Sequence, residues 1–522
     1  MNGKRNRFIL KWMIMLGVML PAQLLHSQGI YDWEAWRSGR NIAGLAASSS
    51  PRGKVDGTVI RSSAEMTGGV ETGGYRSGSD APTLWSGGVK ADSEVHYKDL
   101  LLTGDFSFSL SGGEGMCGSM FTDPGLYPID VLEFTPGAKT LQNYGIGGGM
   151  AWKNGSRFIP GCTMRFVGAN YSKRKDLRHT TYRQEVDLVP SLIYDGDGFV
   201  LGVSGIFGKE SEFVQAEQIG SATAESYYAF LDKGLMYGTY QVWDGNGVHL
   251  TENGVDRLPV RQYSYGAALQ AEIGSFLYAD AEYLFTDGEV GEKGYTWFRF
   301  PGSTIDARIL WTLHRPAGVH VFSARFEWMR QETDESVIDR VTSGGVTTPV
   351  EYGSNRIFER RHVTAGPEYG FYGAGGQELH ASLSVRKEKD RSTLMYPFLD
   401  LDEVTLLRFS SEGSLPLGAF VLDAGLSAGC KIGEHRHYKG NDNESAGLVS
   451  APFRLEDWFV REQELSDAPF VGGALGLRYN FTIAGKYNLY AAAQYSLVHA
   501  FGVVLLDGSE RHTAQIKLGY DF

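Results

Sequence analysis

Segments of about ten residues that alternate between apolar and polar side chains recur along nearly the whole chain. A period of two places one kind of side chain on each face of a β-strand. In residues 100–111, Leu102 and Phe106 lie on one face, whereas Thr103 and Asp105 lie on the other. The same alternation recurs at 277–285, 304–313, 322–328, 379–386 and 489–497. The sequence therefore predicts an all-β fold made of many amphipathic strands.

Two architectures use such strands: a soluble β-sandwich, and a transmembrane barrel with lipid outside and water within. Sandwiches space their turns every ~8–12 residues at both ends. In this chain, short turns such as 98–99, 195–198 and 315–318 alternate along the sequence with long polar segments. These segments are 113–140, 211–258, 333–350 and 434–468. Short turns at one end and long loops at the other are typical of a transmembrane barrel.

Counting the alternating segments from Val55 gives about 18 strands, with sixteen as the alternative count. Single-chain bacterial barrels have an even number of strands, which either count satisfies. An open sheet edge in hydrocarbon would leave backbone N–H and C=O groups unpaired, so the sheet must close. We therefore predict a transmembrane antiparallel up-and-down β-barrel over residues 55–522.

The final strand alternates as well, with Leu518, Tyr520 and Phe522 on its apolar face. This ending resembles the C-terminal signature of bacterial outer-membrane barrels. The resemblance implies an integral outer-membrane location. It also implies that the barrel-assembly machinery reads these three residues, and that membrane lipids and lipopolysaccharide surround the barrel. Trp and Tyr near predicted strand ends, such as Trp152 and Trp328, fit the aromatic girdles of such barrels.

Residues 1–27 are expected to form a cleavable signal peptide. Lys4, Arg5 and Arg7 supply a basic start, and an apolar run follows at 12–20. The overall pattern, including the Ser27–Gln28 cleavage region, resembles the uncharacterised outer-membrane barrels of Bacteroidota. That resemblance bears on location more than on activity.

The remaining N-terminal stretch, 28–54, is expected to be either a periplasmic tail or a plug inside the barrel. Candidate plug residues are Trp33, Trp36, Asn41 and Leu45. The string from Asn41 to Leu45 is similar to the Asn-Pro-Ala-Gly-Leu string of long-chain fatty-acid transporter barrels, although Ile42 stands where that family has proline. In that family the segment implies a hatch and the uptake of hydrophobic substrates. TonB-dependent receptors, by contrast, carry a globular plug domain far larger than this stretch. We therefore expect that this chain is not such a receptor, although it could accompany one.

Charged residues on the faces expected to point inward are candidates for lining the lumen. They are Asp105, Arg165, Asp280, Glu282, Arg308, Arg325, Arg386 and Arg478. Their signs are mixed, whereas a charge-selective pore needs like charges in a ring. A hydrated wall tied together by arginine–carboxylate pairs is the expected arrangement.

The chain is not expected to be an enzyme, and no motif points to a cofactor or a metal. His380, Ser382 and Ser384 share an inward face, but residues two apart on a strand are ~7 Å apart, too far for a nucleophile and its base. The net charge of −12 argues against nucleic acid as a partner. Three cysteines cannot form a disulfide framework.

Two functions fit these features. The first is a channel or transporter for small or hydrophobic solutes. The second is a surface-binding or assembly partner of another outer-membrane protein, a lipoprotein or a TonB-dependent receptor, acting through long loops such as 211–258 and 434–468.

Overall fold

The computed structural model describes residues 36, 40–47, 54–55, 58–153, 155–217, 228–242, 257–274, 276–292, 295–393, 400–434, 455–483 and 487–521. The expected signal peptide, Trp33 and Phe522 lie outside these residues. No helix within the described ranges is long and apolar enough to cross a membrane.

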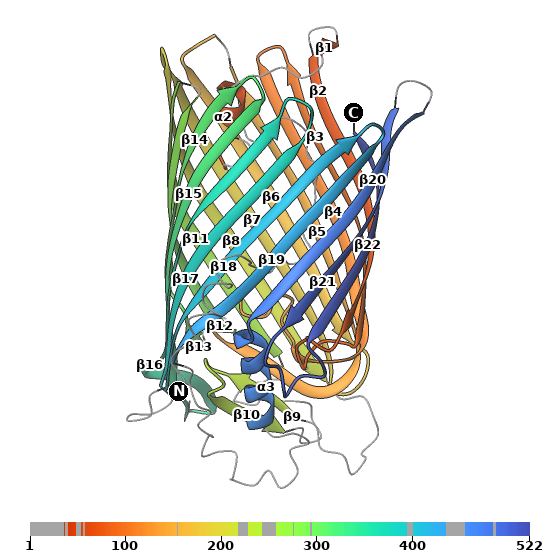
Figure 1. Ribbon diagram of the computed structural model, residues 1–522. Helices are drawn as coiled ribbons and strands as arrows, with labels where there is room; N and C mark the ends of the chain where they lie inside the picture. The colour runs from red at the N-terminus through yellow and green to blue at the C-terminus, as the bar shows by residue number, and fades with distance from the viewer. Residues whose placement is uncertain are drawn as a thin grey trace, which may run out of the picture.

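Eighteen antiparallel strands close into one barrel (Figure 1). In ring order they are β2 (Thr58–Gly73), β3 (Thr83–Tyr97), β4 (Leu100–Ser119), β5 (Asp130–Trp152), β6 (Phe158–Lys173), β7 (Arg178–Asp195), β8 (Phe199–Glu217), β11 (Arg257–Ile273), β12 (Leu277–Glu292), β14 (Gly302–Arg315), β15 (Gly318–Ser343), β16 (Val346–Gly373), β17 (Glu378–Ser392), β18 (Asp400–Leu417), β19 (Phe420–Glu434), β20 (Phe470–Ile483), β21 (Tyr487–Ala500) and β22 (Glu510–Asp521). The prediction of an 18-strand up-and-down barrel is confirmed.

The barrel closes where β22 pairs with β2, from Ser63 opposite Asp521 to Gly73 opposite Arg511. Leu518 and Tyr520 lie within this seam, opposite Met66 and Ala64. The C-terminal strand therefore joins both ends of the sheet. Its role as an assembly signal stays a prediction.

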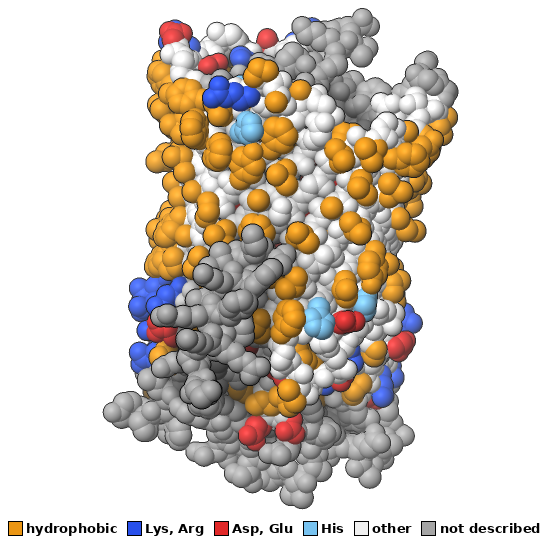
Figure 2. Space-filling view, in the orientation of Figure 1, with side chains coloured by type: hydrophobic (Ala, Val, Ile, Leu, Met, Phe, Trp, Pro, Cys, Tyr) orange, Lys and Arg blue, Asp and Glu red, His pale blue; other side chains and the backbone are white. Residues whose placement is uncertain are grey.

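The outer surface of the barrel is apolar. Large hydrophobic side chains stay exposed at alternate strand positions, among them Phe106, Ile146, Met164, Leu269, Trp311 and Leu475. Figure 2 shows hydrophobic side chains spread over the visible wall, with charged side chains gathered toward the two ends. Apolar side chains that face water carry a free-energy cost, and contact with lipid hydrocarbon removes it. This exterior therefore suits a lipid bilayer.

The two ends of the barrel differ. At the end drawn at the top of Figure 1, called here the turn end, short turns such as 98–99 and 418–419 join the strands. At the opposite loop end the chain adds β9 (Tyr228–Asp232), β10 (Gly238–Val242), β13 (Tyr295–Arg299) and the helix α3 (Leu455–Asp467). The turn end instead carries β1 (Lys54–Val55) and the helix α2 (Ile42–Ala47).

The predicted loop at 333–350 is wrong. β15 continues to Ser343 and β16 begins at Val346, so the two strands form one long hairpin. The segment looked like a loop because its polar residues lose the apolar alternation that lipid imposes on the membrane-spanning part.

The segment at 120–129 folds inward and crosses the mouth at the loop end. Thr122 N–H donates to Glu212 Oε1 at 2.7 Å, and Tyr127 Oη donates to Glu210 Oε1 at 3.0 Å, both on β8. Apolar side chains of this segment join an inward-facing core. Members of this core are Phe121, Tyr127, Ile129, Val214, Leu258, Val260, Trp297, Phe300 and Phe358. We call this group of residues the mouth core, and it lies inside the loop end of the barrel.

The helix α3 covers a neighbouring part of the loop end. Leu455, Trp458 and Phe459 are buried against Phe134 and Phe230. The Glu462 carboxyl accepts hydrogen bonds from Ser77 Oγ and from Gly78 N–H, and burial raises its pKa.

Three charged side chains of β5 and β6 are buried at the loop end of the barrel. The side chains of Glu133, Lys139 and Lys173 have no exposed surface. Lys139 Nζ lies 3.0 Å from Glu133 Oε1, and Lys173 Nζ bonds the other carboxylate oxygen. Lys139 also donates to the carbonyl oxygens of Cys117 and Ser119. One carboxylate thus compensates two ammonium groups.

Replacing this carboxylate should destabilise the loop end. We expect Glu133→Ala to cost about 3–5 kcal/mol, because two buried ammonium groups lose their counter-charge. Urea unfolding of the refolded barrel, with hydrogen exchange at 117–139, measures the change. The matched control is Glu351→Ala, whose ion pair with Arg299 is exposed and should contribute less than about 1 kcal/mol. Equal losses for the two variants would contradict the buried-charge interpretation.

Candidate functional site

The eight candidate lumen residues all alternate with outward-facing apolar neighbours on their strands. Met164 flanks Arg165, Phe326 flanks Arg325, and Leu477 flanks Arg478, and each of these flanking side chains is exposed. Since successive side chains of a strand point to opposite faces, the charged residues point into the barrel. Their part in conduction stays a prediction.

Most of these charges are paired. Arg308 donates to Asp280 at 2.7 Å, and Arg386 forms an ion pair with Glu388 at 2.7 Å. Arg325 pairs with Asp306, through Nε at 3.1 Å. Arg478 donates to Asn480 and lies over the Tyr490 ring, 4.1 Å from its centre. Pairing of this kind ties the wall together without giving it one sign of charge.

Residues from the N-terminal stretch lie against the inner wall at the turn end. Asn41 is fully buried and Trp36 is 2% exposed. Asn41 Nδ2 donates to Gln270 Oε1 at 3.0 Å, and Trp36 Nε1 donates to Glu272. These two contacts and the ion pair of Arg40 with Glu282, at 3.4 Å, all join the segment to β11 and β12.

Asn41 also caps the start of the helix α2, which begins at Ile42. Its Oδ1 accepts a hydrogen bond from the Ala43 N–H at 3.1 Å, which satisfies one of the free donors at a helix start. The rest of α2 packs into an apolar cluster on the wall. Its members include Trp36, Ile42, Ala43, Leu101, Ala151, Ile159, Ile193, Tyr278, Leu310 and Val321, and Leu45 packs at its edge. The segment is therefore anchored by polar and apolar contacts alike.

Three glycines make room for this segment. A Cβ at Gly149 would lie 2.5 Å from Ile42 Cδ1, and one at Gly161 would lie 2.8 Å from Ile42 Cγ2. A Cβ at Gly202 would lie 2.9 Å from Asn41 Nδ2. The three glycines come from β5, β6 and β8, and together they form what we call the socket. The wall is thus shaped to fit residues 40–47.

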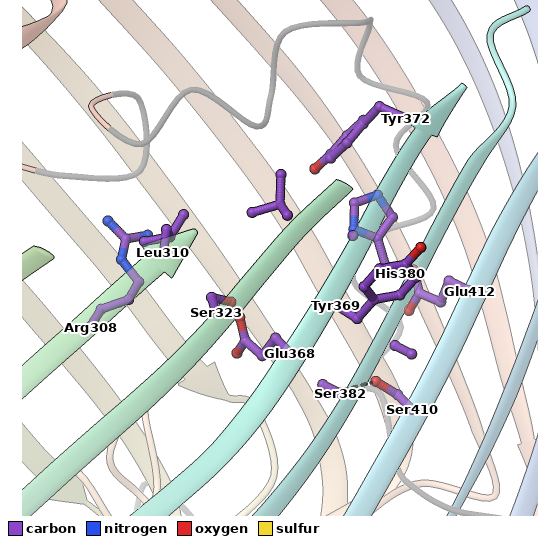
Figure 3. A pocket seen from close by; sticks show the side chains of 13 residues that line it. Arg308, Leu310, Ser323, Glu368, Tyr369, Tyr372, His380, Ser382, Ser410 and Glu412 are labelled. Atoms are coloured by element: carbon purple, nitrogen blue, oxygen red, sulfur yellow. Dashed lines mark hydrogen bonds between the residues drawn. The ribbon is translucent and has the colours of Figure 1, made fainter. Parts of the chain in front are cut away.

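A recess lies on the inner wall near the turn end of β14–β18 (Figure 3). Its volume is about 330 Å³. Polar lining groups are Ser323, Glu368, His380, Ser382, Ser410 and Glu412. The described residues contain no group of three or more His, Cys, Asp or Glu able to hold a metal ion. Since Ser382 bonds Ser410 rather than His380, the pair considered for nucleophilic chemistry is not hydrogen-bonded here.

A hollow of about 520 Å³ occurs at the loop end, called here the basic hollow because Arg174, Lys175 and Arg178 line it. Glu114 and Asp176 line it too, and Arg178 forms an ion pair with Asp176 at 2.6 Å. Lys173, adjacent in sequence, takes no part in it, because its ammonium group is buried against Glu133.

The sequence did not single out the socket glycines, Gln270 or Glu272. Glycine at inward strand positions is a signal of close approach. The element that approaches, however, is known only once the barrel is closed, since Asn41 and Gln270 are 229 residues apart.

A side chain at the socket should displace the N-terminal segment. We expect Gly161→Val to raise hydrogen exchange at 40–47, because the new side chain would overlap Ile42 and the Ala43 backbone. The matched control is Gly168→Val on the same strand, where a Cβ makes ordinary contacts of 3.4 Å or more. Unchanged protection in Gly161→Val would show that the socket does not hold the segment.

Comparison with solved structures finds several barrels. The ferric preacinetobactin receptor BauA from Acinetobacter baumannii aligns over 89% of this chain and 80% of its own, with 8% identity and a TM-score of 0.39. The copper transporter OprC aligns over 91% and 84%, with 9% identity and a TM-score of 0.40. OccK9 from Pseudomonas aeruginosa aligns over 90% and 100%, with 8% identity and a TM-score of 0.32. Likenesses this remote carry no argument about function.

No curated protein sequence matches the chain. A family model described as "Family of unknown function (DUF6850)" matches residues 57–522, which span the whole barrel. The chain therefore belongs to the DUF6850 family.

Proposed function

We propose that this protein is an integral outer-membrane barrel that passes solutes, and that Trp36 and residues 40–47 gate its lumen. The observation that carries the proposal is the socket of Gly149, Gly161 and Gly202, which fits a segment that is not part of the wall. A fitted obstruction held by side-chain contacts can leave without breaking the barrel.

The inner wall supports passage of polar solutes. Arg165 and Asp105 are exposed within the barrel, and neither forms an ion pair with another described residue. An 18-strand barrel has room for an aqueous channel unless something fills it. The hydrophobic substrates implied by the fatty-acid-transporter resemblance fit this charged wall less well.

The orientation follows from the two ends of the barrel. Short turns face the periplasm in outer-membrane barrels, so the socket would open to that side and the mouth core to the outside. The basic hollow at Arg174, Lys175 and Arg178 is then placed to meet lipopolysaccharide phosphates. Recognition of the last strand by the barrel-assembly machinery and the lack of enzymatic activity belong to the same proposal.

A second candidate function is docking of another outer-membrane protein or a lipoprotein. It is favoured by the β15–β16 hairpin, which continues past its neighbours at the loop end and leaves Tyr352 66% exposed. Exposed aromatic side chains are common anchors of interfaces. The packed mouth core would suit a barrel that binds rather than conducts.

Conductance in planar bilayers separates the two candidates. Deleting residues 29–50 should turn a silent or weakly conducting barrel into a steadily conducting one, because the lumen loses its fitted obstruction. A milder variant, Arg40→Ala with Asn41→Ala, should give brief openings, since it removes the bonds to Glu282 and Gln270.

The control for the point variants is Arg157→Ala, which removes an exposed ion pair with Asp197 at a turn. It should leave conductance unchanged. Currents that stay absent after the deletion, in a barrel that still unfolds cooperatively, would overturn the gate and favour the docking role.

A further inference from the structure

We infer that the recess on the inner wall of β14–β18 binds an uncharged, hydroxyl-rich solute of the saccharide class. This inference rests on the proposed function, because it names the class of solute that the lumen would pass. The strand register, the charges that line the recess and the side chains at its edge support it (Figure 3).

One row of inward positions crosses four neighbouring strands. Ser323 lies opposite Glu368, Glu368 opposite Ser382, and Ser382 opposite Ser410. Ser323 Oγ donates to Glu368 Oε2 at 3.1 Å, and the hydroxyls of Ser382 and Ser410 are 2.8 Å apart. With strands about 4.8 Å apart, the row spans about 14 Å of wall. Polar oxygens thus form a continuous line along the floor of the recess.

A second row, nearer the turn end, supplies depth. It runs from Gly370 through His380 and Glu412 to Gly425. Gly370 lines the recess without a side chain, and the Tyr372 ring lies over it, since a Cβ there would be 3.2 Å from Tyr372 Cε2. The Glu412 carboxylate forms no hydrogen bond or ion pair with any other residue in the described part of the chain, so its acceptor positions remain available to a solute.

The charges in the recess disfavour an anionic solute. Arg308 lines one side and is compensated by Asp280 at 2.7 Å, whereas Glu368 and Glu412 line the other. An anion would meet the two carboxylates, and a cation is therefore the competing candidate. A hydroxyl group both donates and accepts hydrogen bonds, so it can use serine, carboxylate and arginine partners together.

The edge of the recess offers apolar surface. The Tyr372 ring packs edge-on against His380, with ring centres 5.1 Å apart. Leu310 lies beside Arg308 (Figure 3), and Val321 also lines the recess. Sugar rings present C–H groups on their faces and hydroxyls at their rims. A line of polar oxygens beside an aromatic and aliphatic edge matches both surfaces.

The probe for this inference is maltotriose, with spermidine and succinate as charged comparisons. Binding to the full-length purified barrel is measured by titration calorimetry in a zwitterionic detergent, since a detergent with a sugar headgroup would compete. We expect maltotriose to bind and both charged compounds to fail. Ser382→Ala with Ser410→Ala should weaken maltotriose binding on the order of tenfold, because two hydroxyl partners are lost.

The matched control is Ser62→Ala with Ser93→Ala. This pair has the same 2.8 Å contact, but it lies on the outward faces of β2 and β3. It should leave maltotriose binding unchanged. Glu412→Gln should weaken maltotriose binding less than the double serine variant does, because the amide keeps one acceptor oxygen for a neutral hydroxyl.

Absence of maltotriose binding to the wild-type barrel would overturn the inference. So would equal binding by the Ser382/Ser410 variant and the wild type, or spermidine binding that Glu412→Gln abolishes, which would indicate a cation site. Binding in detergent requires no transport. A conducting barrel that ignores maltotriose would therefore refute this inference alone, and a barrel that binds maltotriose but stays silent after deletion of 29–50 would refute the proposed function alone.

Discussion

The pairing of β22 with β2 is the constraint on which the rest of the structure depends. In hydrocarbon, each unpaired backbone N–H or C=O costs several kcal/mol, so an open sheet of this length could not span a bilayer. Closure requires an even set of antiparallel strands with one apolar face each. The inner face is then released from contact with lipid, and it can carry charges, glycines and hydroxyls where a site needs them.

The inner wall uses that freedom in two ways. Most arginines on it bond carboxylates on the same or the next strand, as Arg308 does with Asp280. Such pairs stiffen the wall without selecting an ion. Near the turn end, however, glycines replace side chains at Gly149, Gly161 and Gly202, and the N-terminal segment fills the space that they leave.

The sequence was sufficient for the barrel because lipid imposes a local rule, alternation, on every strand. All eighteen strands could be located in this way, with Leu102 and Phe106 facing out and Asp105 facing in on β4. Alternation is not required of strand residues that extend beyond the lipid at the loop end, which explains the missed hairpin at 333–350. The candidate site depends on register between strands. His380 and Ser382 could be assigned to one inward face, but the placement of Glu368 and Ser410 on either side of Ser382 could not.

The position of the N-terminal segment had two predicted alternatives, a tail or a plug, and no local signal decides between them. The anchoring partners Gln270 and Glu282 lie more than two hundred residues from Asn41 and Arg40. Contacts of this kind become visible only when the barrel has brought β11 and β12 to face the start of the chain.

The inward contacts at the two ends of the barrel differ in how easily they come apart. The mouth core is built from the strands and their own connections, so opening it would expose Phe121, Trp297 and Phe358 together. The helix α2 has six residues, which is too short to be stable by itself, and it depends on the wall for its structure. The contacts that hold residues 40–47 at the turn end are therefore the weaker of the two sets.

These turn-end contacts adjoin the recess. Leu310 and Val321 belong both to the cluster around Trp36 and Ile42 and to the recess lining. A solute that rearranges these two side chains changes the free energy of docking for residues 40–47. By thermodynamic linkage, docking of the segment must change the affinity for the solute by the same factor. If residues 40–47 gate the lumen as proposed, this shared pair of side chains would couple the gate to the solute.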